Sequence, residues 1–359
     1  MKKLLALLVA AMMLLAFAGC GGAKAPAAAA PAAEPAAAPA AEPAAEPAAN
    51  EKALKVAMIC DSSISDGGWG MSCYNAMIDA AEKNGWETAY SDSIDQSAYY
   101  DSIVSYCSLG YDMIYAPGNQ YTDAVLQAAE EYPDIAFALL NGAVTTPEKA
   151  TNKNVTSLLP NAQQIGWIAG ALAGLMSESG TIAFIGGMEL DTTLNKYKGY
   201  VEAATFVAEK NGKVIKALEP VYAGSFSDTA KGMEFANTMI EQGADVFFGD
   251  ASAVDSGARQ AIDGYNKAQG SMKVYDIAQP ADLLGQNECI IGSQVTDNSS
   301  LVGLCMQAIK DGTFGGEVIY GTLQNGALSA GKTAEWLDAA VKTQYETYIQ
   351  QMIDDKFMK

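Results

Sequence analysis

The feature that most constrains the fold of this chain is an alternation of short apolar runs with helix-like segments, from about residue 54 to residue 311. Short apolar runs bounded by turn residues are typical of buried strands, and apolar residues three or four apart are typical of helices. The expected strands are 54–60, 87–91, 113–116, 135–140, 155–159, 181–185, 214–222, 245–249, 272–277 and 289–292. The expected helices are 70–84, 98–108, 121–131, 162–178, 194–211, 228–242, 254–268 and 297–311. This alternation predicts an α/β fold with parallel sheets, in which ligands bind beyond the carboxyl ends of the strands.

Two stretches of the chain resemble each other. Gly110–Ala116 (GYDMIYA) and Gly243–Gly249 (GADVFFG) each place Gly-x-Asp before an apolar strand, about 130 residues apart. Each of them follows a predicted helix. The match favours two similarly wound lobes with a ligand cleft between them.

Composition excludes several kinds of function. The chain has no histidine and a single arginine, Arg259, and its formal net charge at pH 7 is −20. Without histidine there is no Ser-His-Asp triad and no histidine-ligated metal. An acidic chain is repelled by nucleic acid and by anionic lipid headgroups. We therefore expect a protein that is not an enzyme, needs no cofactor or metal and does not bind nucleic acid.

The N-terminal segment has the composition of an export signal followed by a tether. Two lysines precede an apolar stretch that is too short for a typical membrane-spanning helix, which predicts a signal peptide over residues 1–19. Residues 17–20 (FAGC) resemble a bacterial lipobox with Cys20 as the lipidated residue; the alternative is an ordinary signal peptide with a chance cysteine. Residues 20–53 hold six of the twelve prolines, which predicts a disordered tether. We expect a protein held at the extracytoplasmic face of the cell membrane by its lipid anchor alone.

The most apolar internal segment is Ile165–Met176 (IGWIAGALAGLM), whose three glycines are spaced four residues apart. Glycines at this spacing allow two helices to pack closely, in membranes above all. The segment has only 12 residues, whereas a membrane-spanning helix needs roughly 20. We therefore expect a buried helix with close backbone packing.

Several motifs follow one another in order between about residues 55 and 330. The most specific is Gly224–Gly232 (GSFSDTAKG), which is followed by Gln242–Val246 (QGADV). Asp66–Trp69 (DGGW) stands where a known family usually has Asp-x-Ser-Phe. In this order the motifs resemble the basic membrane protein family, also called PnrA-like, whose members are lipoproteins that bind nucleosides for ABC importers.

This resemblance implies the type I periplasmic-binding-protein fold, in which two doubly wound lobes close on a ligand by a hinge motion. The expected crossings of the chain between the lobes are near 158–161, 277–280 and 315–320. The expected lobes are 54–157 with 278–316, and 158–277 with 317–359. The implied partners are the permease and ATPase subunits of an ABC importer, and we expect the chain to be a monomer.

Two aromatic residues on loops after strands are the leading candidates for ligand contact. Trp69 lies on a glycine-rich loop after the first strand, and Phe226 lies on a loop just before a helix. Aromatic rings on opposite lobes can clamp a flat heterocycle, with each face contributing about 1–3 kcal/mol. In the family, the matching aromatics stack on the base. The alternative is that each ring covers its own loop.

Carboxylates and amides near these loops are candidates for polar contacts. Asp61 ends the first strand, and Asp66 either contacts the ligand or caps the following helix. Asn141 takes the place of an aspartate with which the family reads the purine edge, and an amide both donates and accepts. The remaining candidates are Asn119, Tyr197, Asp250, Gln279 and Thr296.

The contacts with which the family holds ribose are altered in this chain. The family's Gly-x-Asp falls near Ala278, beside Gln279, and its Ser-x-x-Lys is replaced by Ser293–Thr296 (SQVT). Tyr197 lies one residue out of step with a family aromatic. The aromatic pair is better preserved than the ribose contacts, which makes a flat ring a safer expectation than an intact nucleoside.

The resulting hypothesis is a lipid-anchored receptor that binds a nucleoside or a related flat heterocycle and passes it to a permease. With one arginine, the chain is poorly suited to a nucleotide with its phosphates. Riboflavin-binding and sugar-binding receptors are alternatives with the same fold. A carboxylate-based glycosidase is an alternative of another class, with Asp61, Asp66 and Asp250 as its acids.

Overall fold

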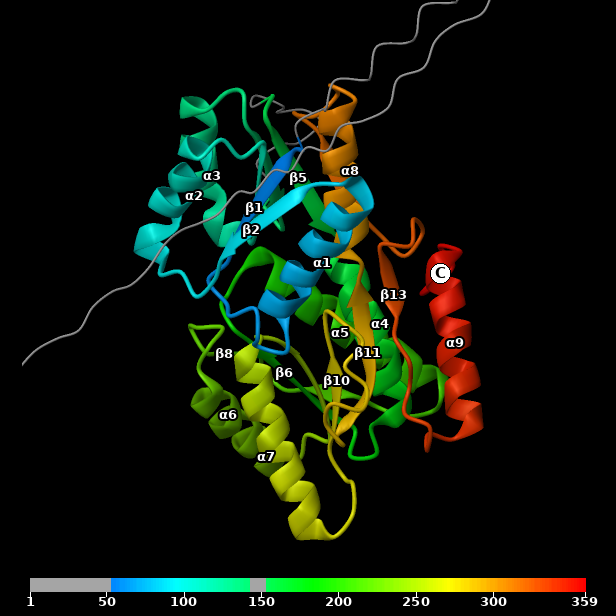
Figure 1. The fold of residues 1–359 in the computed structure, drawn as a ribbon. Helices are drawn as coiled ribbons and strands as arrows, with labels where there is room; N and C mark the ends of the chain where they lie inside the picture. Colours follow the sequence, from blue (N-terminus) through cyan, green and yellow to red (C-terminus); the bar gives the residue numbers. More distant parts are fainter. Residues whose placement is uncertain (1–52, 143–152) are drawn as a thin grey trace, which may run out of the picture. The chain divides into compact units, whose positions relative to one another are not determined.

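The structure is a computed structural model that describes residues 53–142 and 153–359 (Figure 1). The predicted signal peptide, the predicted lipidation site at Cys20 and the predicted tether up to residue 52 lie outside the described residues. The described residues contain two β-sheets, each covered by helices on both faces. The predicted α/β architecture with two sheets is therefore confirmed.

The first sheet has six parallel strands in the order β12-β5-β4-β3-β1-β2. The strands are β1 Lys55–Ile59, β2 Glu87–Ser91, β3 Met113–Pro117, β4 Ala136–Leu140, β5 Val155–Pro160 and β12 Val318–Gly321. Alternate residues of a strand face opposite sides of a sheet. One side packs against α1 (Trp69–Asn84) and α8 (Asn298–Lys310), and the other packs against α2 (Tyr99–Ser108) and α3 (Thr122–Glu131). Because both sides are buried, the inner strands read as continuous apolar runs.

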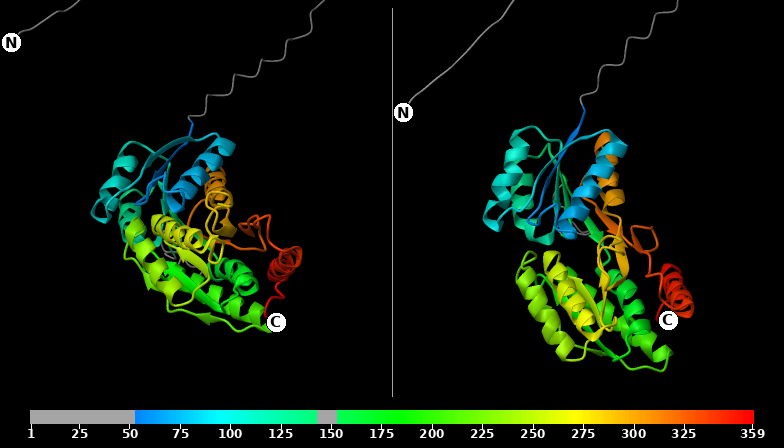
Figure 2. Two further views of the ribbon diagram at one scale, coloured as in Figure 1. Left: turned by 90° about the horizontal axis from the view of Figure 1, so that it is seen from below. Right: turned by 60° about the horizontal axis from the view of Figure 1, so that its bottom comes forward.

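The second sheet has the order β13-β11-β10-β9-β6-β7, with the short β8 paired to β6. The strands are β6 Thr181–Gly186, β7 Lys216–Ala217, β8 Val221–Tyr222, β9 Val246–Asp250, β10 Tyr275–Ala278, β11 Ile290–Thr296 and β13 Leu328–Ala330. Only β13 runs antiparallel to its neighbour. The helices on one side are α4 (Ala162–Met176), α5 (Asp191–Lys210) and α9 (Ala339–Ile353); those on the other are α6 (Thr229–Glu241) and α7 (Ala253–Gln269). Figure 2 shows each sheet with its own helices from two further directions.

Helices α4 and α5 pack backbone to backbone, which explains the glycines of the apolar segment. A Cβ atom added to Gly166 would lie 2.2 Å from the carbonyl oxygen of Lys196, and one added to Gly170 would lie 2.2 Å from that of Tyr200. The predicted buried helix is therefore confirmed. Among the described residues, no helix has both the length and the apolar character needed to cross a membrane. The close packing holds α5 in place, and the first turns of α5 reach the candidate site.

The chain passes between the two sheets at three points in the described residues. It leaves the first sheet after β5, returns to it after β11, and leaves it again after β12. The second crossing comes at Asp297, later than the expected 277–280, because β11 pairs with β10 and β13. The third crossing follows β12, because β12 pairs with β5. Residues 278–296 thus belong with the second sheet and residues 318–321 with the first, which corrects the expected lobe boundaries.

Other differences from the expected elements are local. The expected strand 214–222 consists of the two short strands β7 and β8, with Pro220 between them. Proline has no amide hydrogen to donate to a neighbouring strand, so it interrupts the pairing. The elements β12, β13 and α9 were not expected, because the alternation of apolar runs ends at residue 311.

Candidate ligand-binding site

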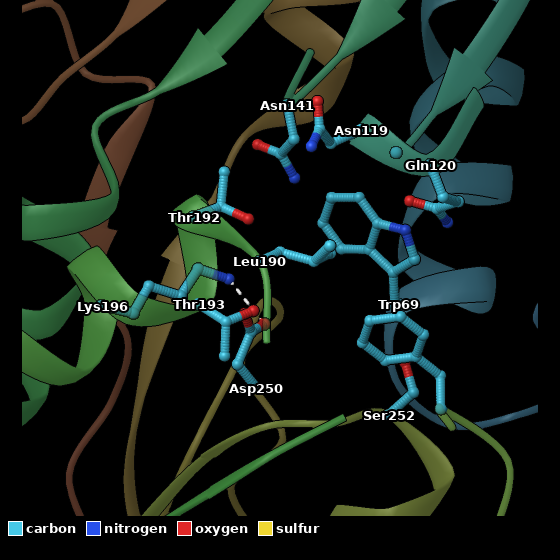
Figure 3. A pocket seen from close by; sticks show the side chains of 12 residues that line it. Trp69, Asn119, Gln120, Asn141, Leu190, Thr192, Thr193, Lys196, Asp250 and Ser252 are labelled. Carbon is cyan, nitrogen blue, oxygen red and sulfur yellow. Dashed lines mark hydrogen bonds and ion pairs between the residues drawn. The ribbon is translucent and has the colours of Figure 1, made fainter. Parts of the chain in front are cut away.

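A cavity of about 420 Å³, part of it open to solvent, lies at the carboxyl ends of strands from both sheets. We call it the ring cavity. Its lining residues are Trp69, Gly118, Asn119, Gln120, Asn141, Leu190, Thr192, Thr193, Lys196, Phe226, Asp250 and Ser252. Figure 3 shows Trp69 beside the amides of Asn119, Gln120 and Asn141, with Lys196 and Asp250 opposite them. The ring cavity lies where parallel sheets usually bind ligands.

Trp69 is the first residue of α1, and the chain around it holds its indole in one place. The indole Nε1 donates a hydrogen bond of 2.8 Å to the carbonyl oxygen of Pro117, at the end of β3. The carboxylate of Asp66 accepts hydrogen bonds from the backbone amides of Gly68, Gly70 and Met71, at 2.8, 2.9 and 3.1 Å. Asp66 therefore caps the helix and does not line the ring cavity.

Three amide side chains line the same wall as Trp69. Asn119 and Gln120 follow β3, and Asn141 follows β4 with a φ of 64°, in the left-handed region that asparagine tolerates. The amide nitrogen of Gln120 donates to Asp61 Oδ2 at 2.9 Å, and the hydroxyl of Tyr99 donates to the same oxygen at 3.1 Å. Asp61 thus lies behind Gln120 and orients it, outside the ring cavity. Burial, together with the Asp61 carboxylate, raises the pKa of Tyr99, so its hydroxyl remains a donor.

The opposite wall carries a buried ion pair. Lys196 Nζ lies 2.7 Å from Asp250 Oδ1, and the side chains are 6% and 18% exposed. Gln279 Oε1 accepts from the same ammonium at 3.0 Å, and Thr193 Oγ1 donates to Asp250 Oδ2 at 2.7 Å. Gln279 Nε2 donates to Asp250 Oδ1 at 3.1 Å and to the carbonyl oxygen of Gly249 at 2.5 Å. Each charge is thus both paired and hydrogen-bonded, as burial of a charge requires.

Lys196 was not among the site residues expected from the sequence, although its spacing from two later residues indicates that it is buried. It lies three and four residues before Gly199 and Tyr200, so these residues share the buried face of α5. A lysine on a buried helix face must have a partner. Tyr197, the expected residue, instead donates its hydroxyl to the carbonyl oxygen of Leu218 at 3.2 Å, outside the ring cavity.

Phe226 reaches the ring cavity from the loop after β8. Its ring lies over Gly187, where an added Cβ atom would be 2.3 Å from the Cδ1 atom of Phe226. Trp69 and Phe226 therefore come from elements of different sheets and line one cavity. Asp228 caps α6 through the backbone amide of Lys231 at 3.1 Å. Thr296 is buried beside Gln294 and lines neither the ring cavity nor the second cavity described below.

A second cavity of about 290 Å³, part of it open to solvent, lies beside the first and shares Trp69, Asp250 and Ser252 with it. We call it the polar cavity. Its lining residues are Gly68, Trp69, Asp250, Ala251, Ser252, Asp255, Arg259, Gln279 and Pro280. The expected site residue Gln279 therefore faces the polar cavity. Asp255 and Arg259 were not among the residues expected to line a ligand site, although both lie on α7, the helix that follows the strand ending in Asp250.

Asp255 is a buried carboxyl group. Its Oδ2 atom accepts a hydrogen bond from the backbone amide of Ala251 at 3.0 Å. A Cβ atom at position 249 would lie 1.9 Å from Oδ1, so only glycine at that position leaves room for this side chain. Burial raises the pKa of Asp255 to about 7; Arg259 opposes the rise and Asp276 adds to it.

Replacing Asp255 by asparagine is expected to stabilise the protein at pH 8 and to leave its stability unchanged near pH 4. An aspartate in the unfolded chain ionises near pH 4, whereas folded Asp255 keeps its proton to about pH 7. The wild-type chain therefore loses stability as the pH rises between these values, by up to about 4 kcal/mol. The asparagine side chain does not titrate, so the stability of the variant does not fall over this pH range through position 255. Urea unfolding at both pH values measures the difference, and an equal difference at both would contradict the assignment.

The described residues offer little for a metal ion. No group of three or more cysteine, aspartate or glutamate side chains among them has the geometry of a metal site. The cysteines in this part of the chain, at 60, 73, 107, 289 and 305, are buried and free. Burial raises the pKa of Cys107 to about 11, so its sulfur stays a thiol at neutral pH.

Comparison with known proteins places this chain in a family. Residues 53–355 match the family model of the PnrA-like ABC transporter substrate-binding proteins. The chain belongs to this family. It is 27% identical over 309 residues to the ABC transporter nucleoside-binding protein BmpA of Lactococcus lactis, covering 80% of this chain and 85% of that protein. An uncharacterized lipoprotein of Pyrococcus abyssi is 29% identical over 271 residues, which cover 68% of this chain and 65% of that protein.

Solved structures agree on the fold of this family member. An ABC transporter solute-binding protein from Aeropyrum pernix K1 superposes with a TM-score of 0.73 at 20% sequence identity, over 84% of this chain and 92% of that protein. The chain therefore has the type I periplasmic-binding-protein fold, as predicted. The family binds small-molecule substrates for ABC transporters. A fold of this kind does not by itself determine which substrate is bound.

Proposed function

We propose that this family member is the receptor of an ABC importer and closes on a flat heterocycle, a nucleoside or a free base, between Trp69 and Phe226. The observation that carries the proposal is that these two aromatic side chains, from elements of different sheets, line one cavity of about 420 Å³. Stacking on aromatic rings contributes about 1–3 kcal/mol per base. Closure of the two lobes on the ring would bring both faces into contact with the protein.

The amides beside Trp69 suit the edge of such a ring. Asn119, Gln120 and Asn141 line the ring cavity, and each amide group has both a donor and an acceptor. Nucleobases present donors and acceptors side by side on their edges. An asparagine at position 141 in place of the family's aspartate supplies a donor that a carboxylate lacks. This difference favours a base whose edge offers an acceptor at that point.

The same contacts support a binding protein over a glycosidase. Such an enzyme needs two carboxyl groups that face the bond to be cleaved. Asp61 lies behind Gln120, Asp66 caps α1, and Asp250 is held by Lys196. We therefore propose that the chain binds its ligand without changing it. We also propose that it acts as a monomer.

We also propose that the receptor is a lipoprotein, attached through Cys20 to the extracytoplasmic face of the cell membrane. The lipobox-like FAGC sequence and the proline-rich segment after it support this. A relative is named as a lipoprotein. The partners would be the permease and ATPase subunits that accept the ligand.

Mass spectrometry of small molecules released from the purified protein on denaturation tests the proposed ligand. We expect a nucleoside or a free base to co-purify, and to raise the melting temperature when added back, because a ligand of the folded state stabilises it. Release of riboflavin would support binding of a flat ring and would show that the substrate is a flavin and not a nucleoside or base. Release of a sugar, with no nucleoside or base shifting the melting temperature, would contradict the proposal.

A further inference from the structure

The amide side chain of Gln120 is held in one orientation by the Asp61 carboxylate. Its Nε2 atom donates to Asp61 Oδ2 at 2.9 Å, and the hydroxyls of Tyr99 and Ser62 donate to the same carboxylate at 3.1 and 3.3 Å. An ionised carboxylate only accepts hydrogen bonds, whereas a glutamine amide has a donor at one end and an acceptor at the other. The NH2 group must therefore face Asp61, which leaves the oxygen, Oε1, on the other side.

The free end of this amide points into the ring cavity. Gln120 lines that cavity, and Figure 3 shows its oxygen turned toward the cavity and its nitrogen turned away. The side chain lies against Gly118, where an added Cβ atom would be 2.2 Å from Oε1 and 2.5 Å from Nε2. Oε1 accepts no hydrogen bond from the described residues. Because hydrogen bonds in a chain polarise one another, the bond to Asp61 makes Oε1 a stronger acceptor.

The other two amides on this wall are not fixed in this way. Asn119 Oδ1 lies 3.2 Å from the hydroxyl of Thr122, and a hydroxyl can donate to an amide oxygen or accept from an amide nitrogen. The side chain of Asn141 makes no hydrogen bond to the described residues. Both amides can therefore turn either end toward a ligand. Of the three, only Gln120 discriminates between a donor and an acceptor on the ligand.

We propose that Gln120 determines which heterocycles bind, by requiring an N–H donor on the ring edge that faces it, and that Asp61 is the positioning residue that enforces this requirement. The inference rests on the proposed function and deepens it. A carbonyl oxygen or an unprotonated ring nitrogen placed against Oε1 would bring two acceptors together and leave both without a hydrogen bond. The preferred substrates are then rings with an N–H group at this edge, and their analogues without it are weaker ligands.

Calorimetric titration at pH 7.5 tests this with pairs of nucleosides that differ by one N–H donor. The pairs are adenosine with purine riboside, guanosine with inosine, cytidine with its analogue that lacks the amino group, and inosine with 1-methylinosine. In the pair that contains the tightest ligand, the form with the donor should bind about 5- to 30-fold more tightly than its partner. This is the range expected for one unmatched hydrogen-bonding group.

Two variants test the acceptor and its positioning separately. In Gln120→Leu the acceptor is absent, so the preference should fall to about twofold or less, through weaker binding of the form with the donor. In Asp61→Ala the amide of Gln120 is free to turn, so the preference should fall in the same way although the glutamine is present. A wall that acted only through its shape would keep the preference in Asp61→Ala. Both variants should fold, because the two side chains are only partly buried.

Asp123→Ala is the matched control, because it removes an exposed carboxylate three residues after Gln120 that lines neither cavity. It should keep the full preference. Equal binding within every pair, or a preference that survives in Gln120→Leu, would overturn the role of Gln120 and leave the ring site standing. A preference lost in Gln120→Leu and kept in Asp61→Ala would overturn the positioning role of Asp61. Failure of every compound to bind the wild-type protein would overturn the proposed function together with the inference.

Discussion

Replacement of Trp69 by alanine is expected to weaken binding of the best nucleoside or base by about 5- to 150-fold. The indole supplies one of the two aromatic faces of the ring cavity, and its loss removes the stacking on that face. Isothermal titration of the variant and the wild-type protein measures the change. The fold should persist, because the helix cap made by Asp66 involves only backbone amides and stays in place.

Two further variants separate stacking from general disturbance. Trp69→Phe keeps an aromatic face but loses the hydrogen bond to Pro117, so its affinity should lie between those of the wild type and Trp69→Ala. Trp336→Ala removes an indole that is 52% exposed and lines neither cavity, and it should bind as the wild type does. Equal affinities in Trp69→Ala and Trp336→Ala would contradict the aromatic clamp.

The elements that carry the ring cavity could be predicted because local signals define them. Each inner strand is a short apolar run, and in parallel sheets the loops after such strands meet at one edge. Trp69, Asn119, Asn141, Phe226 and Asp250 were found in this way, and the structure brings them to one cavity. The roles assigned to them remain proposals that titration will test.

The remaining parts depend on contacts that sequence position does not reveal. Asp61 follows a strand as Asp250 does, but Tyr99 and Gln120 occupy its oxygens. The directions in which Lys196 and Tyr197 point depend on the orientation of α5, which its packing against the glycines of α4 determines. The sheet to which β11 belongs is decided by its pairing with β10 and β13. In each case a residue distant in the sequence determines where the side chain or strand lies, and the local sequence pattern does not indicate which residue that is.

Lys196 offers the largest expected effect on stability. Removing one partner of a buried ion pair leaves the other charge buried and unpaired, which costs about 3–5 kcal/mol. Lys196→Met is therefore expected to lower the free energy of unfolding by about that amount, because Asp250 lies 2.7 Å from the ammonium and is 18% exposed. Urea unfolding at pH 7 measures the loss. Lys198→Met removes the same charge from an exposed position on the same helix, and it should change stability by less than about 0.5 kcal/mol.

The double variant Lys196→Met with Asp250→Asn tests the cause of that loss. If the unpaired carboxylate is responsible, neutralising it should restore about half or more of the stability lost in Lys196→Met. The amide oxygen of an asparagine at position 250 can still accept from Gln279, and its NH2 group can donate to the hydroxyl of Thr193, so the rest of the network has partners. If the double variant is no more stable than Lys196→Met, lost packing of the lysine stem explains the effect and the charge pairing does not. Recovery would show that the wall facing Trp69 owes its stability to the pairing of the two charges. A ligand that separated Lys196 from Asp250 would then have to supply a new partner for each of the two charged groups.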